Sequence, residues 1–313
     1  MNGSVAAAGT LGIQVLDARG AETLRDSFRM DHPALSSFGN RSISFDIGGS
    51  AVRVFSASQV ISSFDADGVI VSASINQNGW FCVVSQRGGG NRGFISVYNN
   101  NGASVFDVDM RTGFALAAAL SPDNKNLAIL SLTETGSRIT FYHNIDRDDE
   151  PHDTFDFPGN LIIDISYLDN NDVLAISTDL VFLVTDSGES RALYPFQDNR
   201  LGSYAHAGDF IALHIYDYGI GHRGRIVALL TDGTVLGESF TDREIISMSA
   251  IDRSLVVLKS DGVVFYSDEL EEFYACAGYL SAAGSSQVLA ILEDTALATS
   301  DSSAIVFKRE GAR

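Results

Sequence analysis

Four short runs of β-forming residues, each closed by turn residues, recur about every 40 residues along this chain. The runs FISVY (94–98) and VFDVD (105–109) alternate with a period of two, which is typical of half-buried strands. Pairs such as Asn101-Gly102 and Asp232-Gly233 separate the runs, because Asn, Asp and Gly accept the positive φ of tight hairpin turns. Helical periodicity is nearly absent. The pattern therefore predicts an all-β fold.

The period of the repeat predicts one particular all-β architecture. A unit of four short antiparallel strands at this spacing is the blade of a β-propeller. A single blade cannot bury both of its faces, so neighbouring blades have to pack against each other. The first run of each block carries small or polar residues, such as Ser72 and Ser74, which suit a strand beside a narrow, wet central channel. The blocks begin near Pro33, Ile70, Phe114, Leu161, Leu201, Ile245 and Gln287.

The two ends of the chain decide the number of blades. The last block, 287–310, has three runs, while the stretches 12–20 and 22–28 have the pattern of third and fourth strands. Pairing both ends would remove exposed edge strands, so we expect the N- and C-terminal strands to close one blade. This favours seven blades, and eight blades with two incomplete ones are the alternative. We predict a single propeller domain over residues 1–313, with residues 1–10 outside its ordered part.

Charge and composition exclude several classes of protein. The 313 residues include 40 acidic and 21 basic side chains, which gives a formal net charge of −19. Binding to nucleic acid or to anionic lipid needs a basic surface, so we expect neither. No apolar run approaches the ~20 residues of a membrane span, and the first residues lack the pattern of a signal peptide. Cys82 and Cys276 lie in apolar runs, and we expect both to be buried thiols.

Four stretches of the sequence carry a family resemblance. They are IQVLDARG (13–20), HPALSSFGNRSISFDIGGSAVRVF (32–55), the pair GWFCVVSQ (79–86) and GFISVYNNNG (93–102), and ALSPDNKNLAILSL (119–132). In these stretches the chain resembles bacterial proteins of the domain-of-unknown-function family 5711, and the resemblance extends from about residue 13 to 308. It implies a WD40-like propeller outside the cytoplasm, tethered by an N-terminal transmembrane helix that we do not expect within this chain. The family has no assigned activity, so the resemblance supplies no catalytic residues.

One loop concentrates acidic residues and is a candidate cation site. The sequence NIDRDDEPHD (144–153) contains Asp146, Asp148 and Glu150, together with two further aspartates. Calcium takes six to eight oxygen ligands, but this loop lacks the glycine and the glutamate of an EF-hand loop, and Pro151 interrupts it. We therefore favour a solvated acidic connection between a third and a fourth strand. A partner that contacts it is expected to be basic, and salt should weaken that binding.

Three histidines in one block are the other metal candidates. His206, His214 and His222 are spaced eight residues apart, but even spacing along a hairpin does not place side chains on one face. A zinc site requires the rings to converge with a further ligand, so we favour no metal at these residues. His214 lies within the apolar run FIALHIYD, where we expect a hydrogen-bonded strand residue. We expect no cofactor, and the sequence shows no nucleophile elbow or phosphate-binding loop.

These observations favour a binding function over catalysis. We expect a non-catalytic binding or scaffolding propeller, outside the cytoplasm at a bacterial cell surface by the family resemblance. Its partner would be a protein, a peptide or a glycan at one propeller face, since a rigid scaffold displays loops there. One alternative is a carbohydrate-active lyase or hydrolase with its site at the channel mouth, and another is a ligand-sensing ectodomain. The chain itself leaves a cytoplasmic location open.

Overall fold

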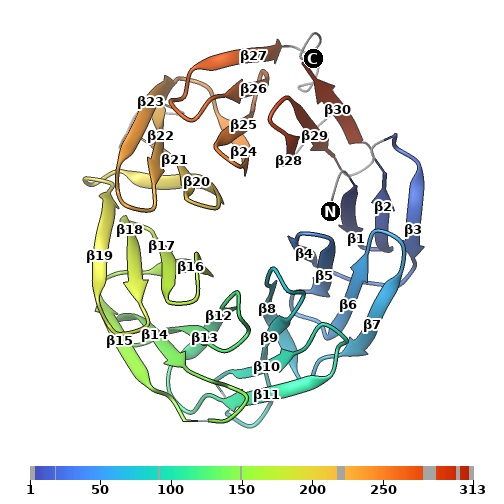
Figure 1. The fold of residues 1–313 in the computed structure, drawn as a ribbon, viewed down its shortest axis with the longest axis vertical. Coiled ribbons are helices and arrows are strands. Elements are labelled where there is room, and N and C mark those ends of the chain that lie inside the picture. The colour runs from blue at the N-terminus through green and yellow to red at the C-terminus, as the bar shows by residue number, and fades with distance from the viewer. Residues whose placement is uncertain are drawn as a thin grey trace. The chain divides into compact units, whose positions relative to one another are not determined.

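The computed structural model describes residues 4–17, 19–90, 92–148, 150–216, 223–277, 287–300 and 304–309. Over these residues the chain forms thirty β-strands and no helix, so the all-β prediction is confirmed. The strands form eight antiparallel sheets, six of four strands and two of three, which are the blades of a β-propeller (Figure 1). Among the described residues, no helix is long and apolar enough to cross a membrane. The chain divides into two compact units.

The first unit comprises Met1–Ser177 and Phe182–Arg191. Four sheets lie wholly within it, and each has its strands in sequence order. Their strands are β1 (Val5–Gly9), β2 (Gly12–Leu16) and β3 (Glu22–Asp26); β4 (Pro33–Phe38), β5 (Arg41–Asp46), β6 (Ala51–Ser56) and β7 (Val60–Asp65); β8 (Val69–Ile75), β9 (Phe81–Gln86), β10 (Phe94–Tyr98) and β11 (Ser104–Asp109); and β12 (Phe114–Leu120), β13 (Leu127–Leu132), β14 (Gly136–Tyr142) and β15 (Asp153–Pro158). A fifth sheet contains residues of both units and consists of β16 (Ile162–Tyr167), β17 (Asp172–Ser177), β18 (Leu180–Thr185) and β19 (Ser190–Pro195).

The second unit comprises Thr178–Val181 and Ala192–Arg313 and holds the remaining sheets. Two have four strands in sequence order, and one has three. Their strands are β20 (Arg200–Ala207), β21 (Phe210–Tyr216), β22 (Gly224–Leu230) and β23 (Val235–Thr241); β24 (Ile245–Ile251), β25 (Ser254–Lys259), β26 (Gly262–Tyr266) and β27 (Glu272–Ala277); and β28 (Gln287–Leu292), β29 (Thr295–Thr299) and β30 (Ala304–Lys308).

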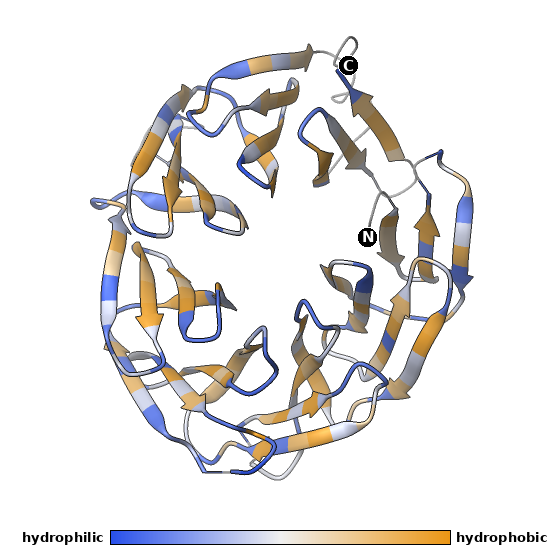
Figure 2. Ribbon diagram, viewed as in Figure 1, coloured by the Kyte–Doolittle hydropathy of each residue, from blue (hydrophilic) through white to orange (hydrophobic). Residues whose placement is uncertain are grey.

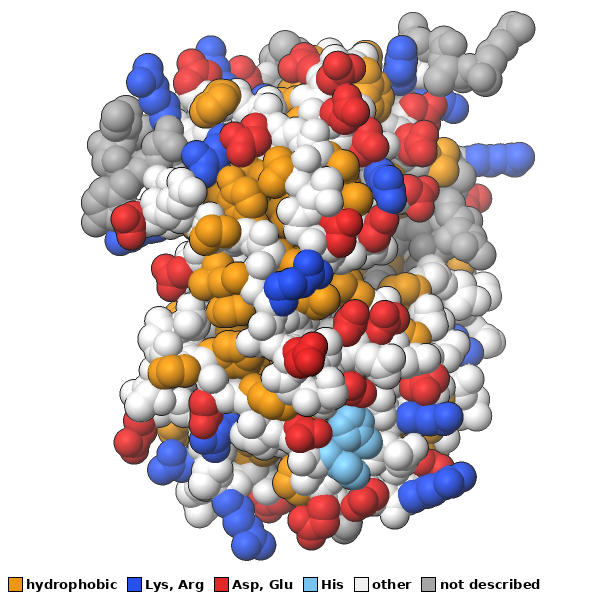
Figure 3. Space-filling view, turned by 60° about the vertical axis from the view of Figure 1, so that its left-hand side comes forward, with side chains coloured by type: hydrophobic (Ala, Val, Ile, Leu, Met, Phe, Trp, Pro, Cys, Tyr) orange, Lys and Arg blue, Asp and Glu red, His pale blue; other side chains and the backbone are white. Residues whose placement is uncertain are grey.

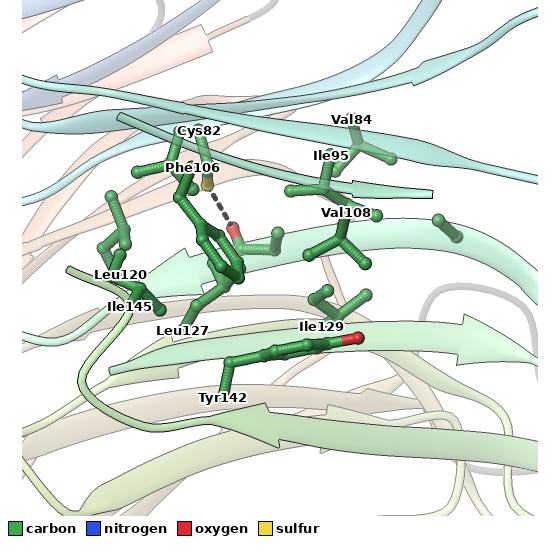
Figure 4. Packing of buried hydrophobic residues seen from close by; sticks show 13 residues of the cluster. Cys82, Val84, Ile95, Phe106, Val108, Leu120, Leu127, Ile129, Tyr142 and Ile145 are labelled. Carbon is green, nitrogen blue, oxygen red and sulfur yellow. Dashed lines mark hydrogen bonds between the residues drawn. The ribbon is translucent and has the colours of Figure 1, made fainter. Parts of the chain in front are cut away.

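Each strand's composition follows from its position in its blade. Second strands such as β13 are buried along almost their whole length and consist of aliphatic residues, because both sheet faces are covered (Figure 2). Fourth strands such as β11 alternate buried and exposed residues, since one face meets solvent. Figure 4 shows how neighbouring sheets of the first unit pack, with Phe106 of β11 and Tyr142 of β14 at 5.7 Å between ring centroids. Cys82 is buried in this cluster as expected, whereas Cys276 is half-buried.

The blade count differs from the favoured expectation. The N-terminal runs do not join the last block: β2 and β3 pair with β1 in one sheet, and β28–β30 form another. The expectation of seven blades with a shared closing blade is therefore wrong, and the alternative of eight blades with two incomplete ones is correct. The strand that the sequence did not reveal is β1, whose sequence VAAAG contains alanines that have little β-propensity. Val5–Gly9 lies within the stretch 1–10 that we set apart from the propeller.

Five first strands share a β-bulge near their beginning. In each, two residues of the first strand face one residue of the second, and the extra residue is the second or third of the strand. The residue before the bulge is buried in four of the five strands, as Ile70 and Ile162 illustrate. A bulge re-aims the side chains that follow it. The extra residues are Val71, Leu116, Ile163, Gly202 and Ile246.

The serines that follow these bulges connect neighbouring blades. In the first unit, the hydroxyls of Ser72 and Ser74 donate hydrogen bonds to backbone carbonyls of β12, each at 2.8 Å. In the second unit, Ser247 and Ser249 accept hydrogen bonds from backbone N–H groups of β28 at 3.2 and 3.0 Å. Polar residues at these positions therefore join one first strand to the next, a role that the channel interpretation of the sequence did not foresee.

Candidate functional site

The loop between β14 and β15 returns the chain beside its starting point. Phe141 pairs with Asp153 across the two strands, and the backbone N–H of His152 donates to the carbonyl of Phe141 at 2.9 Å. Ile145 holds the loop in place, because its side chain is buried in the core and its N–H donates to the carbonyl of Lys125 at 3.0 Å. The end of β14 and the beginning of β15 are thus fixed side by side.

Two histidines and three aspartates gather where this loop meets the end of β18. His143 follows β14, His152 precedes β15, and their rings lie 4.8 Å apart, centroid to centroid, in an edge-to-face arrangement. We name these residues the His–Asp cluster: His143, His152, Asp148, Asp153 and Asp186.

His143 lies between two carboxylates from different blades. Its Nε2 is 3.8 Å from Oδ2 of Asp153, and its Nδ1 is 3.7 Å from Oδ2 of Asp186, which directly follows β18. His152 presents its Nε2 to Oδ2 of Asp148 at 3.5 Å. These contacts are ion pairs when the rings are protonated. The imidazoles are partly enclosed, with 18% of the His143 side chain exposed, while Asp148 and Asp153 remain close to half exposed.

Further acidic groups adjoin the cluster at the same end of the neighbouring sheet. Burial, together with the negative charges of Asp169 and Asp186, raises the pKa of Asp172 above its ordinary value. Tyr167 lies at the end of β16, and its hydroxyl is buried without a hydrogen-bond partner among the described residues. Burial, with a smaller contribution from Asp186, raises the pKa of Tyr167. The carboxylates around the cluster therefore favour the binding of a positively charged group.

The arrangement suits a cationic side chain better than a metal ion. Over the described residues, no three His, Cys, Asp or Glu side chains converge in a way that could hold a metal. The two nitrogens of His143 face different carboxylates on opposite sides of the ring, whereas a zinc ligand set converges on one point. Carboxylates with exposed oxygens accept charge-assisted hydrogen bonds from Arg or Lys. Figure 3 shows histidine side chains bordered by acidic side chains on one face of the molecule.

The acidic candidates predicted from the sequence do not form a cage. Asp146 pairs with its neighbour Arg147 at 3.4 Å, and both side chains are mostly exposed. Asp148 accepts the backbone N–H of Glu150 at 3.1 Å and faces His152. Glu150 is exposed. These side chains are thus exposed or close to half exposed, and Asp148 belongs to the His–Asp cluster.

The histidine candidates do not converge either. His206 in β20 pairs with Ile211 across the sheet, while His214 in β21 pairs with Ser203, three residues away along β20. An odd separation places the two side chains on opposite faces of the sheet. His222 lies outside the described residues.

His214 departs from the expectation of a hydrogen-bonded ring. Its side chain is fully buried, and neither ring nitrogen has a partner among the described residues. Two glycines make room for it: a Cβ on Gly202 would lie 2.8 Å from Nδ1, and a Cβ on Gly224 would lie 3.0 Å from Nε2. Tyr216 covers the ring edge-to-face at 4.3 Å between centroids. Burial lowers the pKa of His214 to about 4.

Sequence reasoning missed His143 and His152, although the pairing rule of an antiparallel hairpin could have brought them together. In an antiparallel hairpin, residues whose numbers have a constant sum face each other, and the pair Phe141 and Asp153 sets that sum. By this rule His152 stands opposite Tyr142, which is the residue before His143. Counting outward from the acidic loop would have found the two histidines. Asp186 could not be found in this way, because it comes from the next blade.

The comparison with known proteins concerns the family alone. No curated protein matches the chain. The model of a family of unknown function, DUF5711, matches residues 1–274, which is well over half of the 313 residues. The resemblance seen in the sequence is thereby confirmed, and the chain belongs to the DUF5711 family.

Proposed function

We propose that this propeller is a non-catalytic binding module whose His–Asp cluster binds a basic segment of a partner protein or peptide. The observation that supports the proposal is the placement of Asp148 and Asp153, both close to half exposed, beside two histidines whose rings meet edge-to-face. His143, His152 and Asp153 adjoin the ends of β14 and β15, so little conformational entropy is lost when a partner orders them. A Lys or Arg side chain of the partner would take the place of the histidines and pair with the exposed carboxylate oxygens of Asp148 and Asp153.

The charge of the whole chain supports the same partner. A formal net charge of −19 attracts basic segments over long range and speeds their encounter with the surface. Exposed pairs are screened over a Debye length of ~8 Å at physiological ionic strength, so binding should be strongly salt-dependent. A neutral glycan would bind chiefly by hydrogen bonds and stacking, and its affinity would change little with salt.

Calorimetry with a lysine-rich peptide tests the proposal. The variant Asp148→Asn/Asp153→Asn removes the two half-exposed charges of the cluster, and we expect about three- to tenfold weaker binding, since each exposed pair contributes ~0.2–1 kcal/mol. The control Asp31→Asn/Asp261→Asn removes the same charge from ion pairs with Arg29 and Arg243 elsewhere. Equal losses in both variants, or no saturable binding to the wild type, would contradict the proposal.

An extracytoplasmic location is part of this proposal, and its support is the family resemblance alone. Protease treatment of intact cells that produce the full-length gene product tests the location. We expect digestion of the propeller without cell lysis, and protection until lysis would contradict it.

A further inference from the structure

Over the described residues, the last sheet of the second unit has three strands where a complete blade has four. β28 is its first strand, because its backbone N–H groups donate hydrogen bonds to Ser247 and Ser249 of β24, the first strand of the preceding sheet. β29 and β30 then take the second and third positions. Among the described residues, β30 pairs only with β29, so the position of the fourth strand is vacant there.

The free edge of β30 presents unpaired backbone groups in a defined register. The N–H of Arg309 donates to the carbonyl of Asp294 at 3.0 Å, and Lys308 stands opposite Thr295. Hydrogen-bonded and non-hydrogen-bonded pairs alternate along an antiparallel ladder. The N–H and C=O groups of Val306 and Lys308 therefore point away from β29, towards the free edge. Val306 is 60% exposed, and Lys308 is exposed as well.

The side chains of β30 divide between the two faces of its sheet. Phe307 is buried against the β24–β27 sheet, and Ile305 packs against the same cluster. These two side chains anchor β30 from one face. The strand is thus held in an extended conformation, and its free edge is prepared for pairing without further ordering.

The six complete blades show the chemistry of a fourth strand in this protein. Two of these strands, SVFDVD of β11 and DTFDFP of β15, alternate aromatic or aliphatic residues with acidic residues along part of their length. A basic residue on the third strand can face an acid on the fourth: Arg138 stands opposite Asp156, and the two form an ion pair at 2.6 Å. β30 ends in Lys308, which has the same charge as Arg138.

We propose that the free edge of β30 accepts a β-strand from a partner protein, an extended segment that alternates aromatic or aliphatic residues with acidic ones. Main-chain hydrogen bonds to Val306 and Lys308 would supply affinity, and Lys308 would select acidic residues. This site lies in the second unit and uses residues other than those of the His–Asp cluster. It is therefore independent of the proposed binding of basic segments.

A peptide copied from the chain's own fourth strand provides the probe. We would measure the fluorescence anisotropy of labelled ASVFDVDM (residues 103–110) on titration with the full chain. The wild type should bind saturably. Val306→Pro removes one outward N–H and leaves the ladder to β29 intact, so we expect at least about tenfold weaker binding. Val306→Thr keeps the N–H and should bind like the wild type.

Two further measurements separate charge and self-association. The protein variant Lys308→Glu should bind the wild-type peptide several-fold more weakly. The wild-type protein should likewise bind a peptide carrying Asp107→Lys and Asp109→Lys several-fold more weakly. If Val306→Pro loses its fold by circular dichroism, the comparison of Lys308→Glu with Val306→Thr decides. No saturable binding to the wild type, or equal affinity for both peptides, overturns the proposal. A wild-type dimer that Val306→Pro dissociates on sedimentation also overturns it, because the occupant is then a second copy.

Discussion

At the scale of single residues, polar groups without partners are the most informative feature of this structure. His214 is fully buried between Gly202 and Gly224, and its ring nitrogens have no partner among the described residues. A buried imidazole of this kind stays neutral, because burying its charged form costs free energy. The residue therefore links the stability of the second unit to pH.

We predict that the free energy of unfolding falls as the pH drops through the window from about 6.5 to 4. Burial lowers the pKa of His214 to about 4 in the folded state, so within this window only the unfolded chain takes up the proton. The full effect is ~3 kcal/mol. Urea denaturation of His214→Leu should show a shallower pH dependence than the wild type, and the exposed His32→Gln should not. An unchanged dependence in His214→Leu would disprove this linkage.

The two cysteines are predicted to differ in reactivity. Burial raises the pKa of Cys82 to about 11, and its thiol donates to the carbonyl of Ala118 at 3.2 Å. Because the thiolate is the reactive form, iodoacetamide should modify the half-buried Cys276 first and Cys82 only on unfolding. Mass spectrometry of peptides from the native protein measures both rates. Equal rates in the folded state would show that Cys82 is accessible.

At the scale of single elements, bulged first strands and their serines connect the blades. The bulge buries the residue before it and turns the serine after it towards the next blade. Removal of these hydroxyls takes one hydrogen bond from each of the Leu116 and Ala118 carbonyls of β12, although Ala118 keeps its contact with the Cys82 thiol. The interface between β8 and β12 therefore depends on both packing and hydrogen bonding.

Replacing both serines of β8 should measurably destabilise the first unit. Each of Ser72→Ala and Ser74→Ala is expected to cost about 1 kcal/mol, because each hydroxyl donates one hydrogen bond to β12. The exposed Ser58→Ala serves as the control and should leave the free energy of unfolding unchanged. Denaturant titration of the three variants provides the comparison. A cost that matches the control would mean that water replaces these hydrogen bonds without loss.

How far sequence predicts these elements depends on the contrast between apolar and polar residues. Second and third strands such as β9 and β10 were predictable, since their aliphatic runs end in Asn-Gly or similar turns. β1 was not, because its alanines do not distinguish a strand from a loop. The acidic loop after β14 was found, but its contact with Asp186 was not, because packing between blades determines it.

At the scale of the whole molecule, counting repeats in the sequence predicted the complete blades but not the arrangement of the incomplete ones. Six blocks are complete in the sequence and in the structure, and the error lay in joining the incomplete ends. Avoidance of exposed edges is a sound general rule, but over the described residues β1–β3 and β28–β30 form two separate three-stranded sheets. The edge that remains on β30 is the place where we propose that a partner strand binds.

The acidic surface is the other property of the whole molecule, and it carries the central claim. A carbodiimide joins lysine amines to carboxylates that lie in contact, and the chain's own lysines number only three, Lys125, Lys259 and Lys308. Cross-linking a lysine-rich peptide to the protein and locating the linked carboxylates by mass spectrometry therefore tests the site directly. We predict that the links concentrate on Asp148 and Asp153 and disappear at high salt. Links spread over all exposed acidic residues, or gathered on another blade, would contradict the account.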